Sequence, residues 1–342
     1  MAPIGPGKWF RSGKFRTMLV PSGIHHVTAI ASDPQRNIDF YAGVLGLRLV
    51  KRTVNFDDPT TYHFYFGDEI GRPGTLLTFF PWPNARRGRQ GAGQAAVTSF
   101  AIVPGSVGFW LERLLKHGVD FEQPATRFDG ERVIALKDPD GLLLELVSHQ
   151  RVEQFEPSAD PGSSTQVPPA HGIRGVYSVT LWQDGQQHTA DLLTTSLGFR
   201  LAREQGSIFR YTSDDSGPGS IVDLRIVPGL WPGVMGAGTV HHVAFRAADD
   251  QTQIGVRDEL ELSGYNATPA LDRDYFKSVY FREPGGVLFE IATDGPGFTV
   301  DEPEASLGRA LRLPAWLEPR RFEIEALLPN IHLPIDLPGP NA

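Results

Sequence analysis

Thr239-Val-His-His-Val-Ala-Phe245 is an apolar stretch with two adjacent histidines, and Gly23-Ile-His-His-Val-Thr-Ala29 repeats its pattern near the start of the chain. The apolar and β-branched residues of both stretches predict strands. A carboxylate, Glu290, lies in the last segment of similar composition. Histidine and carboxylate side chains on short strands are the raw material of a metal site. Whether these residues converge depends on how the segments between them repeat.

The composition is that of an ordinary globular protein. The chain has 342 residues, enough for about two domains, and 40% of them are hydrophobic. It has no cysteine, so metal ligands must come from His, Asp and Glu. A net charge of −8 argues against a nucleic-acid partner. No apolar run reaches the length of a membrane span, so no membrane partner is expected either.

Residues 1–21 are expected to form an N-terminal extension. They are basic and rich in proline and glycine, and they lack the apolar centre of a signal peptide. A transit peptide is an alternative interpretation, but the default expectation is a cytoplasmic enzyme. Assembly into a homo-oligomer is left open.

Four copies of one unit follow the extension. Each copy reads as a strand, a helix that ends at a glycine, and further strands after a glycine turn. The four helix-ending glycines are Gly46, Gly118, Gly198 and Gly264. Repeated βαβββ units predict an α+β fold in which paired modules form half-open β-barrels around a cavity.

The units group into two predicted domains. Residues 22–150 hold the first two modules and residues 172–294 the other two. Residues 151–171 between them are rich in proline, serine and acid, which is typical of a linker. Residues 295–342 form a C-terminal tail that we expect to pack on the core as a short helix.

Two positions in each unit can point into a shared cavity. The position on the first strand holds His26, Ser99, Ser178 and His242, and the position on the last strand holds Thr78, Glu145, Asp223 and Glu290. Only the pairing of the first unit with the fourth collects two histidines and a carboxylate. We therefore predict that pairing, with His26, His242 and Glu290 as the metal ligands.

Two histidines and one carboxylate are the ligand set of non-haem Fe(II) oxygenases. The set also suits other ions, so Mn(II) stays possible. Thr78 holds the fourth position and is not a ligand, which leaves room for a substrate and dioxygen at the metal. Glu145, in a unit without histidine, is interpreted as structural.

Other histidines have simpler interpretations. His63, His149 and His188 are expected to be ordinary core or surface residues. His25 and His241 alternate to the opposite face of their strands, where packing or hydrogen bonding behind the ligands is at least as good an interpretation.

One neighbour of the site follows from turn geometry. Glu283-Pro-Gly-Gly286 suits a type I turn with Gly286 in the left-handed region as a G1 bulge. That bulge would place Tyr280 opposite Glu290 on the same face of the sheet. A phenol beside a metal can hydrogen-bond a substrate oxygen or donate a proton.

Several motifs together resemble the vicinal oxygen chelate superfamily, which comprises glyoxalases, bleomycin resistance proteins and extradiol dioxygenases. The motifs are the two His-His stretches, Tyr62-His-Phe-Tyr-Phe-Gly-Asp-Glu-Ile-Gly-Arg-Pro-Gly-Thr75, Thr78-Phe-Phe-Pro81 and Arg273-Asp-Tyr-Phe-Lys-Ser-Val-Tyr280. Within the superfamily the chain looks like the hydroquinone-type ring-cleaving dioxygenases. The match spans roughly residues 22 to 330.

The resemblance implies Fe(II) held by His26, His242 and Glu290, in agreement with the repeat. It also implies that five further residues lie behind the ligands or touch the substrate: Tyr280, Arg273, His25, His241 and Thr28. Strand alternation points His25 and His241 away from the cavity, so a contact of these two residues with the substrate rests on the resemblance alone.

The function that we expect is oxidative ring opening of a hydroquinone or related dihydroxylated aromatic by O2. A glyoxalase-type isomerase or lyase is one alternative, but it generally uses four protein ligands, and Thr78 argues against it. A metal-free protein that binds or sequesters small molecules is another. Two histidines in matching positions argue against that alternative.

Overall fold

The computed structural model describes residues 20–128, 130–155 and 167–333. Almost all of the predicted extension, residues 1–19, lies outside this part of the chain, as do residues 156–166 of the predicted linker and 334–342 of the tail. The division of the chain into two domains stays a prediction.

Four βαβββ units follow one another, as predicted. The first comprises β1 (Ile24–Ala31), α1 (Pro34–Ile38), η1 (Asp39–Val44), β2 (Arg48–Asn55), β3 (Asp58–Gly67) and β4 (Leu76–Pro81). The second comprises β5 (Gln94–Ile102), η2 (Pro104–Ser106), α2 (Val107–Lys116), β6 (Ala125–Arg127), β7 (Glu131–Lys137) and β8 (Leu143–Ser148). Two short helices, η3 (Gln150–Gln154) and η4 (Pro169–His171), lie between the second unit and the third.

The other two units repeat this order. The third comprises β9 (Val176–Gln183), α3 (Gln187–Thr195), β10 (Arg200–Gln205), β11 (Ile208–Thr212) and β12 (Ile221–Ile226). The fourth comprises β13 (Thr239–Ala247), α4 (Asp250–Leu262), β14 (Leu271–Asp272), β15 (Lys277–Arg282) and β16 (Leu288–Thr293). All four predicted helix-ending glycines have positive φ, between 65° and 87°, a conformation that glycine adopts without steric cost.

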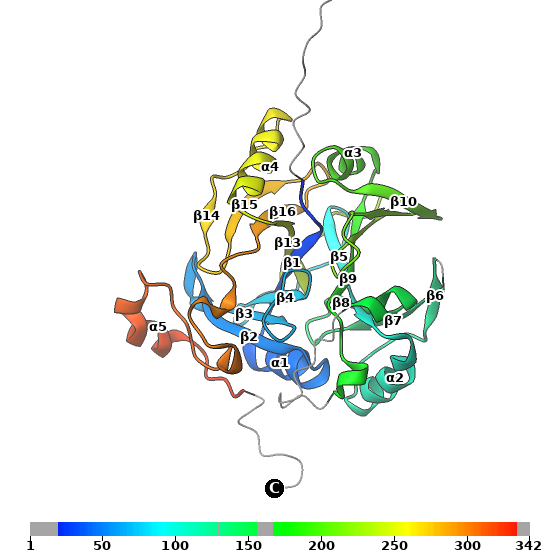
Figure 1. Cartoon of the computed structure of the whole chain (residues 1–342). Helices are drawn as coiled ribbons and strands as arrows, with labels where there is room; N and C mark the ends of the chain where they lie inside the picture. Colours follow the sequence, from blue (N-terminus) through cyan, green and yellow to red (C-terminus); the bar gives the residue numbers. More distant parts are fainter. Residues whose placement is uncertain (1–19, 129, 156–166, 334–342) are drawn as a thin grey trace, which may run out of the picture.

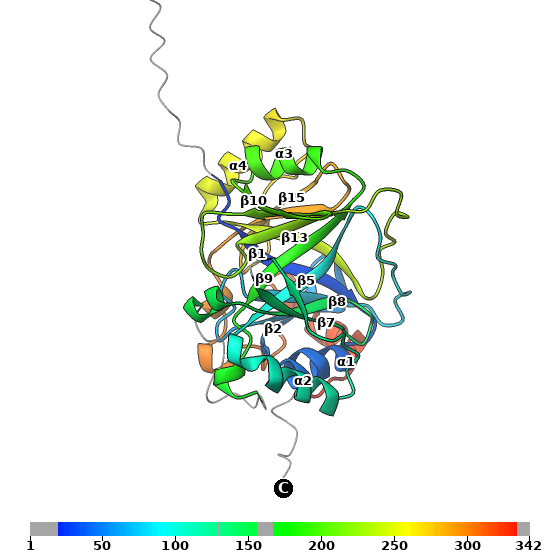
Figure 2. The same cartoon turned by 90° about the vertical axis from the view of Figure 1, so that its right-hand side faces the viewer.

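Two eight-stranded sheets result, and each joins one unit from either half of the chain (Figure 1). The strand order is β14-β15-β16-β13-β1-β4-β3-β2 in the first sheet and β10-β11-β12-β9-β5-β8-β7-β6 in the second. The predicted pairing of the first unit with the fourth is thus confirmed. The helices group differently: α3 and α4 lie together at one end of the molecule, and α1 and α2 at the other (Figure 2).

Two β-bulges shape the centre of the first sheet, where β1 and β13 run antiparallel. The register shifts between Ile24 and His26, so that His25 is an extra residue of β1. It shifts again after Thr28, so that His241 is an extra residue of β13. A bulge interrupts the alternation of side chains between the two faces of a strand.

The turn between β15 and β16 has the predicted form. Gly286 has a φ of 107°, and its N–H donates to the carbonyl of Glu283 at 3.0 Å. Tyr280 lies opposite Glu290, as the bulge predicted.

The chain after β16 covers β2 and β3. It holds η5 (Phe298–Val300), η6 (Glu304–Ser306), η7 (Glu318–Arg320) and α5 (Arg321–Leu327). Ile324 of α5 is buried, and Lys51 of β2 is buried with its ammonium 2.5 Å from Glu302. The described part of the tail, residues 295–333, therefore packs on the core as expected. In the described part of the chain, no helix has both the length and the apolar character that crossing a membrane requires.

Candidate metal centre

Three side chains from the first sheet converge at its centre. His26 comes from β1, His242 from β13 and Glu290 from β16, and their ligand atoms all lie within 4.8 Å of one another. Oε2 of Glu290 is 2.9 Å from Nε2 of His242 and 3.5 Å from Nε2 of His26. The two Nε2 atoms are 3.4 Å apart. The structure thus brings together the three residues that the repeat singled out.

The neighbouring histidine supports each of the two imidazoles from behind. Nδ1 of His25 is 2.9 Å from Nδ1 of His26, and Nδ1 of His241 is 2.8 Å from Nδ1 of His242. A hydrogen bond at Nδ1 fixes the ring and leaves Nε2 free to bind a metal.

Bulges make these contacts possible, and the alternation of side chains along a strand does not predict them. His25 is buried against the ring of Phe276, behind the ligands, as one interpretation of the sequence expected. His241 also lines the cavity next to the site, which strict alternation did not predict.

Glu290 has two oxygens in different environments. Oε1 accepts a hydrogen bond of 2.6 Å from the hydroxyl of Ser278. Oε2 is buried and makes no hydrogen bond of regular geometry. Burial by itself raises the pKa of Glu290, but the facing imidazoles of His26 and His242 hold that pKa well below its usual range. Burial lowers the pKa of His242, which favours a neutral ring.

This donor set fits a divalent metal ion. A carboxylate oxygen and two imidazole nitrogens point toward a common centre, and one of the three is a buried atom without a hydrogen-bond partner. A buried polar atom without a partner is costly unless something compensates it. A cation bound by His26, His242 and Glu290 would compensate all three.

A cavity of about 340 Å³ opens from the centre. Phe56, Phe80, Trp82, Phe276 and Leu288 make its apolar wall. Its polar lining is His26, Asn55, Asp57, His63, Tyr65, His241, His242, Arg273 and Tyr280. A chamber of this size, with an apolar wall and polar groups around it, suits one aromatic ring.

Tyr280 and Arg273 stand together in this cavity. The guanidinium of Arg273 lies 5.7 Å from the centre of the Tyr280 ring and pairs with Asp57 at 3.2 Å. Burial, and after it the carboxylate of Glu290, raises the pKa of Tyr280, so this phenol keeps its proton. Its ring is 5.6 Å from that of His242, which places a proton donor beside the candidate ligand.

Thr78 occupies the position of the first unit that corresponds to Glu290 in the fourth unit. Thr28 lies beside it, and neither threonine lines the cavity. Their hydroxyl oxygens are 2.7 Å apart. Nε2 of His63 is 3.0 Å from the oxygen of Thr78, and the hydroxyl of Tyr65 is 2.9 Å from Nδ1 of His63.

His63 and Tyr65 line the cavity, although we expected His63 to be an ordinary core or surface residue. The pattern Tyr62-His-Phe-Tyr65 held the signal, because residues 63 and 65 share a face of β3.

The second sheet differs from the first at the corresponding positions. The two bulges in the pairing of β5 with β9 flank Val97–Ser99, as the two bulges in the pairing of β1 with β13 flank His26–Thr28. Val97 therefore corresponds to His26, and the assignment of Ser99 to that position was wrong by two residues. The error arose because sequence spacing does not show where a bulge falls.

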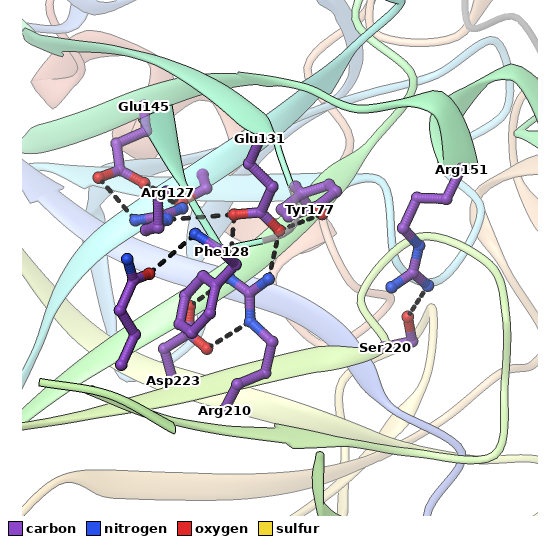
Figure 3. A network of polar contacts seen from close by, with 11 residues as sticks. Arg127, Phe128, Glu131, Glu145, Arg151, Tyr177, Arg210, Ser220 and Asp223 are labelled. Atoms are coloured by element: carbon purple, nitrogen blue, oxygen red, sulfur yellow. Dashed lines mark hydrogen bonds and ion pairs between the residues drawn. The ribbon is translucent and has the colours of Figure 1, made fainter. Parts of the chain in front are cut away.

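A guanidinium occupies the centre of the second sheet. Arg210 lies opposite Asp223 as Tyr280 lies opposite Glu290, and it pairs with both Asp223 and Glu131 (Figure 3). Glu145 pairs with Arg127, which fits the structural role that we expected of Glu145. Among the described residues, His26, His242 and Glu290 form the one group that could hold a metal ion.

Comparison with known proteins agrees with this picture. The glyoxalase/bleomycin resistance protein/dioxygenase superfamily matches residues 23–146 and 176–291. MhqO of Bacillus subtilis, provisionally named a ring-cleaving dioxygenase, is 48% identical over 90% of this chain and 96% of its own length. The chlorohydroquinone/hydroquinone 1,2-dioxygenase of Sphingobium indicum is 34% identical over 88% of this chain and 94% of its own.

Solved structures show the same relationship. A provisionally named dioxygenase from Bacillus subtilis superposes with a TM-score of 0.86 at 46% identity, covering 92% of this chain and 98% of its own. Glyoxalase I from Zea mays shares the fold, with a TM-score of 0.58 at 17% identity over 80% of this chain and 92% of its own.

The chain belongs to the glyoxalase/bleomycin resistance protein/dioxygenase superfamily. Within that superfamily it is an enzyme of the ring-cleaving dioxygenase group.

Proposed function

We propose that the chain opens the ring of a hydroquinone or a related dihydroxylated aromatic with O2, using Fe(II) held by His26, His242 and Glu290. The observation that carries the proposal is the set of three converging ligands with Thr78 in the fourth position. Three protein ligands would leave further positions on the ion for the substrate and dioxygen. Mn(II) is the alternative metal, because carboxylate and imidazole suit it as well.

A bound metal would lower the pKa of a phenolic substrate and hold it beside dioxygen, which makes the encounter intramolecular. The protein's own residues do the rest. The apolar wall of Phe80, Trp82 and Phe276 binds the ring and keeps water out. Tyr280, protonated beside Glu290, can donate to a substrate oxygen. The guanidinium of Arg273 offsets negative charge that develops in the cavity.

Oxygen uptake tests this function. The protein is purified without oxygen, loaded with Fe(II), and supplied with a panel of hydroquinones and catechols. We expect iron-dependent uptake with at least one of them. Metal-bound protein that takes up no oxygen with any member of the panel would contradict the dioxygenase and favour a glyoxalase-type reaction. Protein that binds the aromatic but no metal would favour a sequestering role.

A small aromatic compound and O2 are the proposed partners, without nucleic acid or membrane. A cytoplasmic location and assembly into a homo-oligomer stay predictions.

A further inference from the structure

The first sheet has an internal symmetry that relates Tyr65 to Tyr280. Tyr280 of β15 lies opposite Glu290 of β16, and Tyr65 of β3 lies opposite Thr78 of β4. The same cavity therefore has a phenol on each side of the site.

The residue two positions before each phenol repeats the symmetry. Ser278 donates to Oε1 of Glu290 at 2.6 Å, and Nε2 of His63 contacts the hydroxyl of Thr78 at 3.0 Å. Thr78 is the symmetry counterpart of Glu290. On the side of Thr78, the imidazole of His63 contacts the Thr78 hydroxyl, and the phenol of Tyr65 contacts the imidazole in turn. This side is the one left open by the three ligands.

The direction of the hydrogen bonds follows from the chemistry of the groups. Burial, and after it the charges of the nearby histidines, holds the pKa of His63 well below its usual value. The ring of His63 is therefore neutral and carries one proton. Burial likewise raises the pKa of Tyr65, which keeps its hydroxyl protonated. A phenol is a better donor than an alcohol. The phenol therefore donates to Nδ1 of His63, and Nε2–H of His63 donates to Thr78.

This direction fixes what Tyr65 offers to the cavity. Its proton is committed to His63 at 2.9 Å, so its oxygen presents lone pairs only. A hydroxyl that enters the cavity can donate to that oxygen, whereas a methyl group or a carbonyl cannot. The arrangement selects for a ligand with a hydrogen-bond donor on this side.

We propose that Tyr65 accepts a hydrogen bond from the substrate hydroxyl that is not at the metal, and that His63 is the positioning residue that holds the phenol in this role. The pair would make the cavity specific for dihydroxylated rings over rings with a single hydroxyl. This inference rests on the proposed function, because it assumes that the other hydroxyl is at the metal.

Anaerobic calorimetry on the metal-loaded full chain tests the proposal. The probes are hydroquinone and 4-methylphenol, in which a methyl group replaces one hydroxyl. We expect Tyr65→Phe to weaken hydroquinone binding by about three- to tenfold, the range for one neutral hydrogen bond, and to leave 4-methylphenol binding unchanged. Equal effects on the two probes, or no effect on either, would overturn the assignment.

Tyr62→Phe is the matched control. Tyr62 is on the same strand with its ring on the other face, and its hydroxyl donates to the carbonyl of Pro329 at 3.0 Å. Removal of that hydroxyl should change the binding of neither probe. A shift in hydroquinone binding as large as that of Tyr65→Phe would point to a general effect of the strand and contradict the proposal.

His63→Phe tests the positioning role. Without the imidazole the phenol is free to turn, so the preference for hydroquinone over 4-methylphenol should fall, and Tyr65→Phe added to it should have little further effect. Fully additive losses would show that His63 acts independently of Tyr65.

The two proposals fail in different ways. Wild-type protein that binds hydroquinone but takes up no oxygen contradicts the dioxygenase and leaves the calorimetric comparison valid. Wild-type protein that takes up oxygen with hydroquinone, together with a Tyr65→Phe variant of unchanged preference, contradicts the role of Tyr65 alone.

Discussion

At the scale of single residues, the site depends on side chains that hold the ligands as much as on the ligands themselves. Each imidazole has a histidine behind Nδ1, and the carboxylate has Ser278 at Oε1. These contacts leave Nε2 of each imidazole and Oε2 of Glu290 close together at the centre of the site. Such supporting bonds commonly contribute 10- to 100-fold in metal affinity.

Ser278→Ala tests the support of the carboxylate. Loss of the hydroxyl frees Glu290 to turn, so the affinity for Fe(II) or Mn(II) should fall by about 10- to 100-fold, measured by competition with a chelator. Ser99→Ala is the control, since Ser99 donates to Glu145 at 2.7 Å in the second sheet. Equal affinities of the Ser278 variant and the wild type would contradict this support.

The sequence predicted the three residues that converge but not all of their neighbours, for a physical reason. His26, His242 and Glu290 recur at matched places of a repeat, which is visible in one dimension. His63 and Tyr65 acquire their roles from Thr78 on the adjacent strand, and nothing in the spacing of single histidines shows that contact.

At the scale of elements, bulges and one turn decide which side chains reach the site. The turn residues Glu283–Gly286 were readable, because glycine and proline have strong local preferences. The bulges at His25 and His241 were not, since each exists only in the pairing of β1 with β13. A bulge in the pairing of β5 with β9 also explains why the sequence pointed to Ser99 instead of Val97, two residues away, as the counterpart of His26.

Gly286→Ala tests the turn. Its φ of 107° is unfavourable for any residue with a Cβ, although the nearest atom would be 3.8 Å away. We expect a loss of about 1 to 2 kcal/mol in the free energy of unfolding, measured with denaturant.

Gly108→Ala in α2 is the control and should change stability in the opposite direction. Gly108 is exposed and no atom lies within 4 Å of an added Cβ, so alanine should stabilise by about 0.5 to 1 kcal/mol. Similar effects of the two substitutions would show that the φ of Gly286 does not limit the turn.

At the scale of the whole molecule, the two sheets are linked by contacts between units of the same half of the chain. Near α1 and α2, the hydroxyl of Tyr41 donates to Asp138 at 3.0 Å. Near α3 and α4, the hydroxyl of Thr189 donates to Glu283 at 2.8 Å. Each sheet thus contains one unit from each half of the chain, and the contacts at each end of the molecule connect the two sheets. The sequence predicted the first relationship from the histidines, which recur in the first and the fourth unit.

The buried carboxyl group of Asp138 predicts a dependence of stability on pH. Burial raises the pKa of Asp138 from 3.8 to about 6. Because the native state holds this proton more tightly than the unfolded chain, the stabilisation is full below about pH 4 and is lost as the pH rises through 6. Relative to Asp138→Asn, the wild type should lose about 2.4 kcal/mol in the free energy of unfolding between pH 4 and 7.

Denaturant titrations at several pH values measure that difference. Asp258→Asn on the exposed face of α4 is the control and should give the same pH profile as the wild type. A constant difference between the wild type and Asp138→Asn across the range would contradict the shift.

Metal analysis of ligand variants tests the central claim, that the first and fourth units build one metal site, most directly. After loading with Fe(II) without oxygen and removal of free ion, the wild type and the control His149→Ala should each hold about one metal ion per chain. His26→Ala and Glu290→Gln should hold almost none. Full occupancy in His26→Ala, with the fold intact, would contradict the account.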